Sequence, residues 1–165
     1  MKDVEKQLRL VADFQIDCVL IGGVAATVHG CSIPTQDLDI CYSRERQNLT
    51  RVVDALRSVN ASLRGAPKDI AFILDEETLQ HGLNFTFDTQ VGKFDLLGEV
   101  RGVGVYADCI ASSDEAEIFG CRYRVLSLER LIDAKRAAGR PKDLVVLAEL
   151  EAILEYKKQS GGDNS

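Results

Sequence analysis

The chain has 165 residues, a formal net charge of −6, and hydrophobic and charged fractions of 45% and 28%. This length and composition predict one globular domain, because a chain of this size can bury a sizeable core. The negative net charge disfavours nonspecific binding along a nucleic-acid backbone, which depends on many Lys and Arg contacts to phosphates.

The sequence shows no targeting or membrane-spanning signal. The segment Met1 to Lys6 is charged, and no apolar run approaches the length that crosses a bilayer. We therefore expect a cytoplasmic protein without a membrane partner.

The cysteines are odd in number and scattered without CxxC spacing, which fits neither a disulfide framework nor a zinc site. We expect free thiols in or near the core at Cys18, Cys31, Cys41, Cys109 and Cys121.

The N-terminal region is predicted to form a helix, a strand, a glycine turn and a second helix. Apolar residues at helical spacing predict an amphipathic helix over 3–14, and the apolar run 18–21 predicts a buried strand that stops at Gly22-Gly23. A helix over 24–29 should end at Gly30. His29 is expected to be a packing or surface residue.

Two explanations account for the glycine pair, one functional and one conformational. Glycines between a strand and a helix let backbone N–H groups approach an anion closely, with the positive end of the helix behind them. A tight strand-to-helix connection can also require glycine simply because the backbone needs a positive φ.

A short acidic strand follows the loop 31–35. Leu38 and Ile40 alternate with Asp37 and Asp39, so both carboxylates should leave the same side of the strand, roughly 6 to 7 Å apart at the backbone. Two carboxylates held together repel each other unless a cation lies between them. The pattern therefore predicts a divalent-metal site with oxygen ligands.

The middle of the chain should continue with helices and a variable loop. Ser43 is expected to cap a helix over 45–59. The segment 60–69 is predicted as a loop or an edge strand, and 70–74 as helix or strand. A short helix over 75–82 should carry acidic residues at its start only to complement the helix dipole, and His81 is given no role.

A hairpin is predicted from strands over 83–88 and 93–97. In its second strand, Asp95 lies between apolar residues, as Asp39 does. If this strand neighbours the acidic strand, about 4.8 Å away in a sheet, the carboxylates of Asp37, Asp39 and Asp95 should form one cluster. Asp88 is the rival third carboxylate.

The remaining predictions are a mobile glycine-rich loop over 98–104, a helix over 106–111, a connection over 112–118 and a strand over 121–125.

Helices should form the C-terminal part, about 127–158, of a single domain over 1–158. Ser127 should cap a helix that ends at Gly139, and Arg140-Pro141 should begin the last one. The tail 159–165 is expected to be disordered.

Basic residues gather in this C-terminal part. Between Arg122 and Lys142 there are seven basic and two acidic residues, a local excess of five positive charges in an acidic protein. A solvated helix face is one explanation. A cluster that faces the carboxylates and binds a triphosphate is the other.

Gly22-Gly23, followed after thirteen residues by Asp37-Leu38-Asp39 and later by Asp95, resembles the nucleotidyltransferase superfamily that includes DNA polymerase beta. Within it, the segments 131–135 and 140–143 look like those of the abortive-infection (AbiE-type) nucleotidyltransferase toxins. Many relatives have serine where this chain has Gly23, which supplies no hydroxyl.

The resemblance implies an α+β fold, with a mixed sheet flanked by helices. It implies that Asp37, Asp39 and Asp95 bind two Mg²⁺ ions and that Asp95 helps to deprotonate the acceptor hydroxyl. The nucleotide-binding residues would be Gly22, Gly23, Thr35, Lys135, Arg140, Lys142 and Asp143.

The resemblance also implies transfer of a nucleoside monophosphate from a nucleoside triphosphate such as ATP to an RNA or protein hydroxyl. In a toxin, an antitoxin or a second copy of the chain would be the partner. The alternatives are an antibiotic-modifying nucleotidyltransferase and a catalytically silent nucleotide-binding protein.

Overall fold

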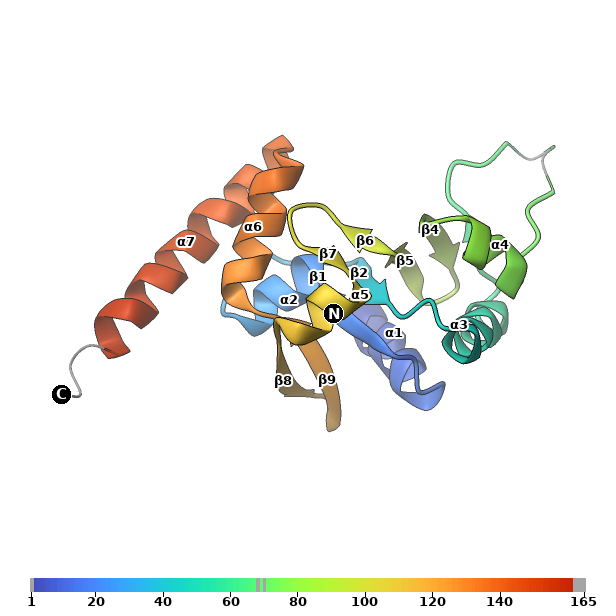
Figure 1. The fold of residues 1–165 in the computed structure, drawn as a ribbon, viewed down its shortest axis with the longest axis horizontal. Helices are drawn as coiled ribbons and strands as arrows, with labels where there is room; N and C mark the ends of the chain where they lie inside the picture. The colour runs from blue at the N-terminus through green and yellow to red at the C-terminus, as the bar shows by residue number, and fades with distance from the viewer. Residues whose placement is uncertain (1, 68, 70, 162–165) are drawn as a thin grey trace.

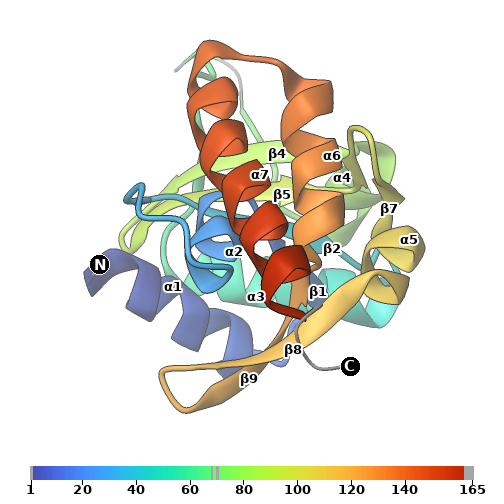
Figure 2. The ribbon, with the colours of Figure 1, turned by 90° about the vertical axis from the view of Figure 1, so that its left-hand side faces the viewer.

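A computed structural model describes residues 2–67, 69 and 71–161. It confirms the α+β class: helices flank a mixed seven-stranded sheet in the order β3-β4-β5-β2-β1-β9-β8, and β6 and β7 form a separate small hairpin (Figures 1 and 2). The strands are β1 (Cys18–Ile21), β2 (Leu38–Tyr42), β3 (Ser62–Leu63), β4 (Asn84–Thr89), β5 (Gly92–Leu97), β6 (Glu99–Val100), β7 (Gly104–Val105), β8 (Ser113–Ile118) and β9 (Cys121–Leu126). The helices are α1 (Lys2–Asp13), α2 (Gly22–Val28), α3 (Arg46–Ser58), α4 (Glu76–His81), α5 (Tyr106–Ala111), α6 (Leu128–Ala138) and α7 (Pro141–Gly161).

Strand β2 lies at the centre of the sheet, antiparallel to β1 and parallel to β5. Its Ile40 is paired in register with Leu20 on one side and Leu96 on the other, and all three side chains are fully inaccessible to solvent. Burying an aliphatic side chain of this size contributes about 1.5–3 kcal/mol. This apolar row fixes the register that positions the acidic residues of β2 and β5.

Local signals in the sequence located most elements correctly. The hairpin β4–β5, the short helices α4 and α5 and the helix α6 lie within about two residues of their expected bounds. Ser127 caps α6 by accepting a hydrogen bond from the Arg130 N–H, and Gly139 ends it with φ of 62°. The cysteines are free thiols, as predicted, with Cys31, Cys41 and Cys109 buried.

Two predictions for non-helical segments were wrong because glycine-rich or acidic composition concealed strands that pair with the next segment of the chain. The segment 98–104 contains β6 and pairs with β7 as a hairpin, so it is not simply a mobile loop. The segment 113–118 is not a connection but the edge strand β8, paired with β9 along its whole length. Residues 71–74 form neither helix nor strand, and Ile70 lies outside the described residues.

Two predictions about helix ends were also wrong. Ser43 does not cap α3, because β2 runs to Tyr42 and the chain needs the next residues to turn, so Glu45 occupies the cap position. Helix α7 continues to Gly161, and the rest of the predicted disordered tail, 162–165, lies outside the described residues.

Helices α6 and α7 pack against each other on the side of the molecule away from α3 and α4 (Figure 1). The β6–β7 hairpin approaches α6 closely at Gly102, where an added Cβ would lie 2.7 Å from the Cβ of Ala137. The helical pair and this hairpin together enclose one side of the acidic end of β2.

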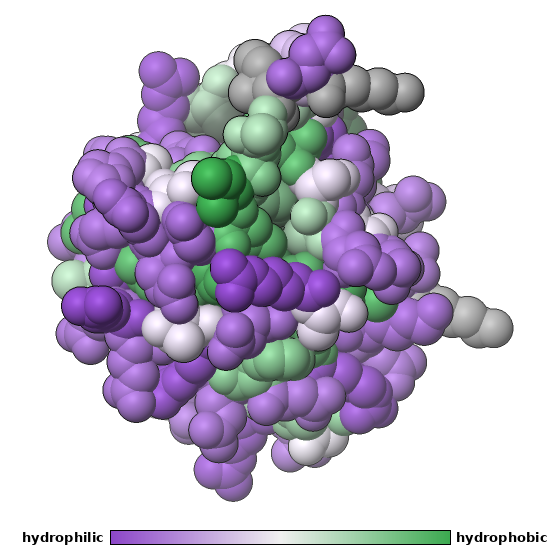
Figure 3. Space-filling model, turned by 90° about the vertical axis from the view of Figure 1, so that its right-hand side faces the viewer, coloured by the Kyte–Doolittle hydropathy of each residue, from purple (hydrophilic) through white to green (hydrophobic). Residues whose placement is uncertain are grey.

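The opposite side of the molecule is closed by aromatic residues. Phe72 lies 5.9 Å from Phe87 and 6.4 Å from Phe85 between ring centroids, so the segment 71–74 packs on β4. Apolar surface is visible among hydrophilic side chains on this face (Figure 3). Within the described residues, no helix is long and apolar enough to cross a membrane.

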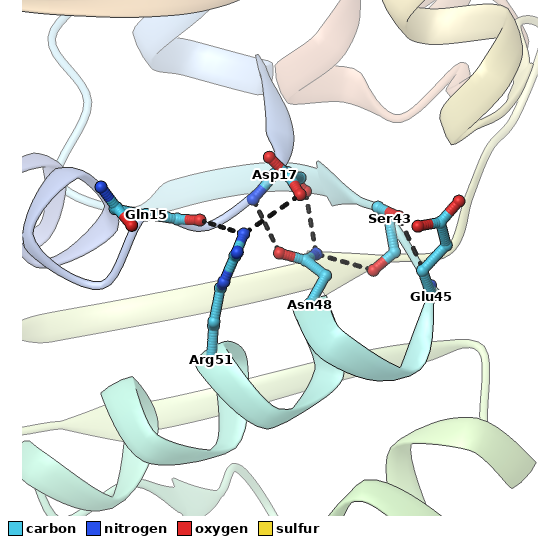
Figure 4. Close-up of polar contacts among 6 residues, drawn as sticks. All are labelled: Gln15, Asp17, Ser43, Glu45, Asn48 and Arg51. Atoms are coloured by element: carbon cyan, nitrogen blue, oxygen red, sulfur yellow. Dashed lines mark hydrogen bonds and ion pairs between the residues drawn. The ribbon is translucent and has the colours of Figure 1, made fainter.

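A buried amide connects α3 to the ends of both central strands (Figure 4). The side chain of Asn48 accepts a hydrogen bond from the Asp17 N–H at 2.7 Å and donates to the carbonyls of Asp17 and Ser43 at 3.0 and 2.7 Å. Asn48 is 1% exposed. It bonds to backbone groups just before β1 and just after β2 and so links these two chain segments to α3.

We predict that Asn48→Ala lowers the free energy of unfolding by about 2–4 kcal/mol, because three hydrogen bonds of a buried side chain are lost, one of them fully buried. Urea denaturation measures the change. Thr50→Ala, an exposed substitution on the same helix, is the control and should cost less than about 0.5–1 kcal/mol. Equal losses in the two variants would contradict a structural role for the Asn48 amide.

Candidate active site

The acidic end of β2 borders a cleft of about 430 Å³. Its walls come from the turn after β1, the loop before β2, strand β5 and the junction of α6 and α7. Among the residues that line it are Gly23, Thr35, Asp37, Asp39, Lys93, Asp95, Lys135, Arg140, Lys142 and Asp143. Elements far apart in the sequence therefore bring carboxylates and cations to one cleft.

Asp39 and Asp95 are direct neighbours. They are register partners on the parallel strands β2 and β5, so their side chains leave the same face of the sheet. Asp37 lies just before β2, two positions from Asp39, and lines the same cleft. The predicted pairing of the two acidic strands is confirmed.

Ionisation of Asp39 and Asp95 is disfavoured, because nearby cations offset burial and charge repulsion only in part. Burial, and next the neighbouring carboxylate of Asp95, raise the pKa of Asp39 from 3.8 to about 7. Burial also raises the pKa of Asp95, although the nearby Arg64 guanidinium opposes this. A cation between these groups would remove the repulsion and favour their ionised forms.

Helix α2 begins at Gly22, directly after β1, so the predicted glycine turn is instead the first turn of this helix, where glycine is required for space as well as for conformation. Gly22 has φ of +63°, and a Cβ at this position would lie 2.1 Å from Oδ2 of Asp39. At Gly23, a Cβ would lie 2.5 Å from the Thr35 hydroxyl, which donates to the Asp37 carbonyl at 3.2 Å. The glycine pair thus leaves room for the Asp39 carboxylate and for the loop that leads into β2.

The basic side of the cleft is built around a buried carboxylate. Asp143, which is 1% exposed, accepts from Lys135 Nζ at 3.1 Å and from Arg140 Nε at 2.5 Å. Burial alone would raise the pKa of Asp143, but hydrogen bonds from Arg140 and Lys135 outweigh it and hold the pKa below its usual value. Asp143 therefore fixes two cations at the cleft.

A smaller cavity of about 130 Å³ lies beside the cleft and shares Asp39, Lys135, Arg140 and Asp143 with it. Its other lining residues are mostly apolar and come from the end of β1, the β5–β6 region and α6: Ile21, Gly22, Leu97, Val100, Arg101, Leu131, Ala134 and Ala138. The space around Asp39 is therefore polar on one side and largely apolar on the other.

Nine of the ten residues singled out in the sequence line the cleft, and Gly22 lines the adjoining cavity. The rival carboxylate Asp88 does not line the cleft and is paired with Arg64 at 3.2 Å. The basic segment divides: Lys135, Arg140 and Lys142 line the cleft, whereas Arg136 pairs with Glu151.

Sequence reasoning missed two cations near the carboxylates. Lys93 lies two residues before Asp95 on β5 and lines the cleft. Strand alternation could have identified it, because positions i and i+2 share a face. Arg64 carried no such signal, because its approach to Asp95 depends on the pairing of β3 with β4.

The carboxylates suit a divalent cation chemically. Asp37, Asp39 and Asp95 offer oxygen ligands at one cleft, and Oδ1 of Asp95, although 3.1 Å from Arg64, has no hydrogen-bond partner. Across residues 2–67, 69 and 71–161, however, no three His, Cys, Asp or Glu side chains already form a group that could hold a metal. The carboxylates would have to turn towards a bound ion.

Comparison with solved structures shows that the chain has the nucleotidyltransferase fold. No family model and no curated protein sequence matches it. The similar structures include the lincosamide antibiotic adenylyltransferase LnuA with lincomycin bound, at a TM-score of 0.60 and 14% identity, covering 93% of this chain and 97% of LnuA.

Two further structures extend this likeness. TM1012 from Thermotoga maritima, whose proposed class is nucleotidyltransferase, has a TM-score of 0.54 and 16% identity, covering 88% of this chain and 92% of its own. The antibiotic-resistance factor ANT(2'')-Ia has a TM-score of 0.51 and 14% identity, covering 97% and 95%. The three matches cover at least 88% of this chain and at least 92% of each matched chain.

We predict that Gly22→Ala destabilises the protein by about 2–4 kcal/mol, because a positive φ costs about 1–2 kcal/mol and the new Cβ also collides with Asp39. Gly120→Ala is the matched control, since Gly120 has φ of +77° and nothing within 4 Å of an added Cβ. It should show the conformational cost alone. Equal losses of unfolding free energy in the two variants would exclude the collision.

The raised pKa of Asp39 predicts a pH-dependent stability. The folded protein retains a proton that the unfolded chain releases between pH 3.8 and about 7, so stability falls as the pH rises through this window. In EDTA, Asp39→Asn should therefore stabilise the protein by roughly 1–3 kcal/mol at pH 8 and by less at pH 5.

Urea denaturation at both pH values measures this difference. Asp54→Asn, which changes an exposed carboxyl on α3, is the control and should give no such trend. An Asp39→Asn advantage that is the same at pH 5 and pH 8 would contradict the assignment of the titration to Asp39.

Proposed function

We propose that this protein is a Mg²⁺-dependent nucleotidyltransferase that moves a nucleoside monophosphate from a nucleoside triphosphate to a hydroxyl group. The observation that carries the proposal is the register pairing of Asp39 with Asp95 at a cleft whose other wall bears Lys135 and Arg140. The likeness of the fold to adenylyltransferases supports it and makes ATP the first donor to test.

Asp37, Asp39 and Asp95 would hold two ions. When bound, such ions stabilise the attacking and leaving oxygens of an in-line displacement at the α-phosphate. The residues of the chain have separate tasks. Asp95 accepts the proton of the acceptor hydroxyl, and the cations Lys135, Arg140 and Lys142 bind the triphosphate and favour departure of pyrophosphate.

Gly22, Gly23 and Thr35 form the nearby wall. The absence of a side chain at the two glycines allows phosphate oxygens to approach backbone N–H groups. Asp143 orients Lys135 and Arg140 from behind, since its carboxylate is buried and already bonded to both. Asp143 is therefore a positioning residue in this scheme.

The acceptor hydroxyl has two candidate sources. The likeness to LnuA, solved with lincomycin, and to ANT(2'')-Ia, solved with adenylyl-2''-tobramycin, favours a small antibiotic-like molecule. The motifs that resemble AbiE-type toxins favour an RNA or protein acceptor, with an antitoxin or a second copy as partner. Incubation with each acceptor class separates the two hypotheses.

We predict that the protein with Mg²⁺ and α-labelled ATP transfers label to at least one acceptor among lincomycin, tobramycin, total RNA and cell protein. Asp39→Asn and Asp95→Asn should each lower the rate by at least about 100-fold, because each removes an oxygen ligand. Asp88→Asn, at the rival carboxylate, should lower it by less than about tenfold.

The measurements are label transfer and pyrophosphate release, with circular dichroism to confirm folding. Asp39→Asn activity equal to that of the wild type would contradict the mechanism. Failure to label any acceptor with any of the four nucleotides would contradict the proposed function, and calorimetric nucleotide binding without turnover would instead support a catalytically silent protein.

A further inference from the structure

Asp95 contacts one cation that the proposed mechanism does not use. Nη2 of Arg64 lies 3.1 Å from Oδ1 of Asp95, and among the described residues it is the cation in ion-pair contact with this carboxylate. The contact is close enough for charge attraction, but Oδ1 has no hydrogen-bond partner, so the two groups are not aligned as a hydrogen bond. The ion pair therefore holds Oδ1 beside the guanidinium by charge attraction, without an aligned hydrogen bond.

Arg64 is held in place by three further contacts. Its backbone N–H donates to the Thr86 carbonyl at 2.8 Å, and Nη2 donates to the Phe87 carbonyl at 2.9 Å. Its Nε lies 3.2 Å from Oδ1 of Asp88. The side chain is 27% exposed. This is an anchored guanidinium rather than a freely moving surface arginine.

Strand topology explains how Arg64 reaches the site. It follows β3 at the edge of the sheet, and β4 separates β3 from β5. Thr86 of β4 is the register partner of Asp95, and Asp88 lies two positions further along β4 on the same face. The guanidinium therefore extends across β4, between Asp88 and Asp95.

The two sides of the Asp95 carboxylate face different groups. Arg64 contacts Oδ1, whereas Asp39 is its neighbour on β2. A carboxylate anchored through one oxygen presents the other in a defined direction, and a misplacement of about 1 Å at a reacting group can cost about 100-fold in rate. Arg64 thus has the placement needed to orient Asp95 without touching a substrate.

We propose that Arg64 is a positioning residue that fixes the Asp95 carboxylate for proton transfer from the acceptor, with Asp88 as the anchor of Arg64. This inference rests on the proposed function. It assigns catalytic importance to a side chain that does not line the cleft.

The test combines steady-state kinetics with Mn²⁺ binding measured by electron paramagnetic resonance. Arg64→Ala should lower kcat by about 10- to 100-fold with little change in the KM for nucleotide, because orientation is lost and nucleotide contacts are kept. Its affinity for Mn²⁺ should be unchanged or higher, since a cation beside a ligand has been removed.

Two variants separate positioning from folding. Arg64→Lys keeps the charge but not the planar fork, so it should recover part of kcat. Asp88→Asn should lower kcat in the same direction but by less than tenfold, because the contact of Arg64 with the Phe87 carbonyl stays. Arg9→Ala, at an exposed pair on α1, is the control for loss of a surface arginine.

The outcomes distinguish this inference from the proposed function. Suppose that the wild type binds Mn²⁺ and transfers nucleotide. The positioning role would then be overturned if Arg64→Ala kept the wild-type kcat. It would also be overturned if Arg64→Ala and Arg64→Lys lost Mn²⁺ binding and kcat in parallel. A folded wild type that neither binds Mn²⁺ nor transfers nucleotide would overturn both.

Discussion

The parallel pairing of β2 with β5 is the constraint on which the site depends. This register places Asp39 directly beside Asp95. Residues around the two carboxylates accommodate this arrangement. Gly22 leaves space for one carboxylate, and Arg64 lies against the other. A shift of either strand by one residue would turn one carboxylate to the opposite face of the sheet and replace it with an apolar side chain.

The same pairing weakens the fold where it creates the site. Loss of solvent around the carboxyl, and next the neighbouring Asp95, raise the pKa of Asp39 to about 7, which reflects a cost of ionising this group in the folded protein. Apolar residues on either side of them, including Leu38, Ile40 and Leu96, are fully buried and offset that cost. Conflict between local stability and local chemistry is typical of functional sites.

The parts of the site that follow from short-range patterns could be predicted from the sequence. Alternation of Asp37 and Asp39 with Leu38 and Ile40 located the acidic strand, and the glycine pair located the turn that faces it. The expected position of Asp95 followed from the same alternation. These signals depend on neighbours within a few residues, so one sequence was enough.

The parts that depend on pairing between strands could not be predicted in the same way. Three of the six residues of β8 are acidic, so the sequence predicts a connection there. Its pairing with β9 makes it a strand. The position of Arg64 follows from the pairing of β3 with β4 across more than twenty residues. Composition alone also does not tell which basic residues of the C-terminal part line the cleft: Lys135, Arg140 and Lys142 do, whereas Arg136 pairs with Glu151.

The buried carboxylate of Asp143 has a consequence for ligand recognition. Long cationic side chains ordinarily lose about 1.5–2 kcal/mol of rotamer freedom when they are immobilised. Here Lys135 and Arg140 are already restrained in the folded chain by their bonds to Asp143. Much of that entropy loss therefore accompanies folding, so binding of the proposed triphosphate would be opposed less by ordering of the protein.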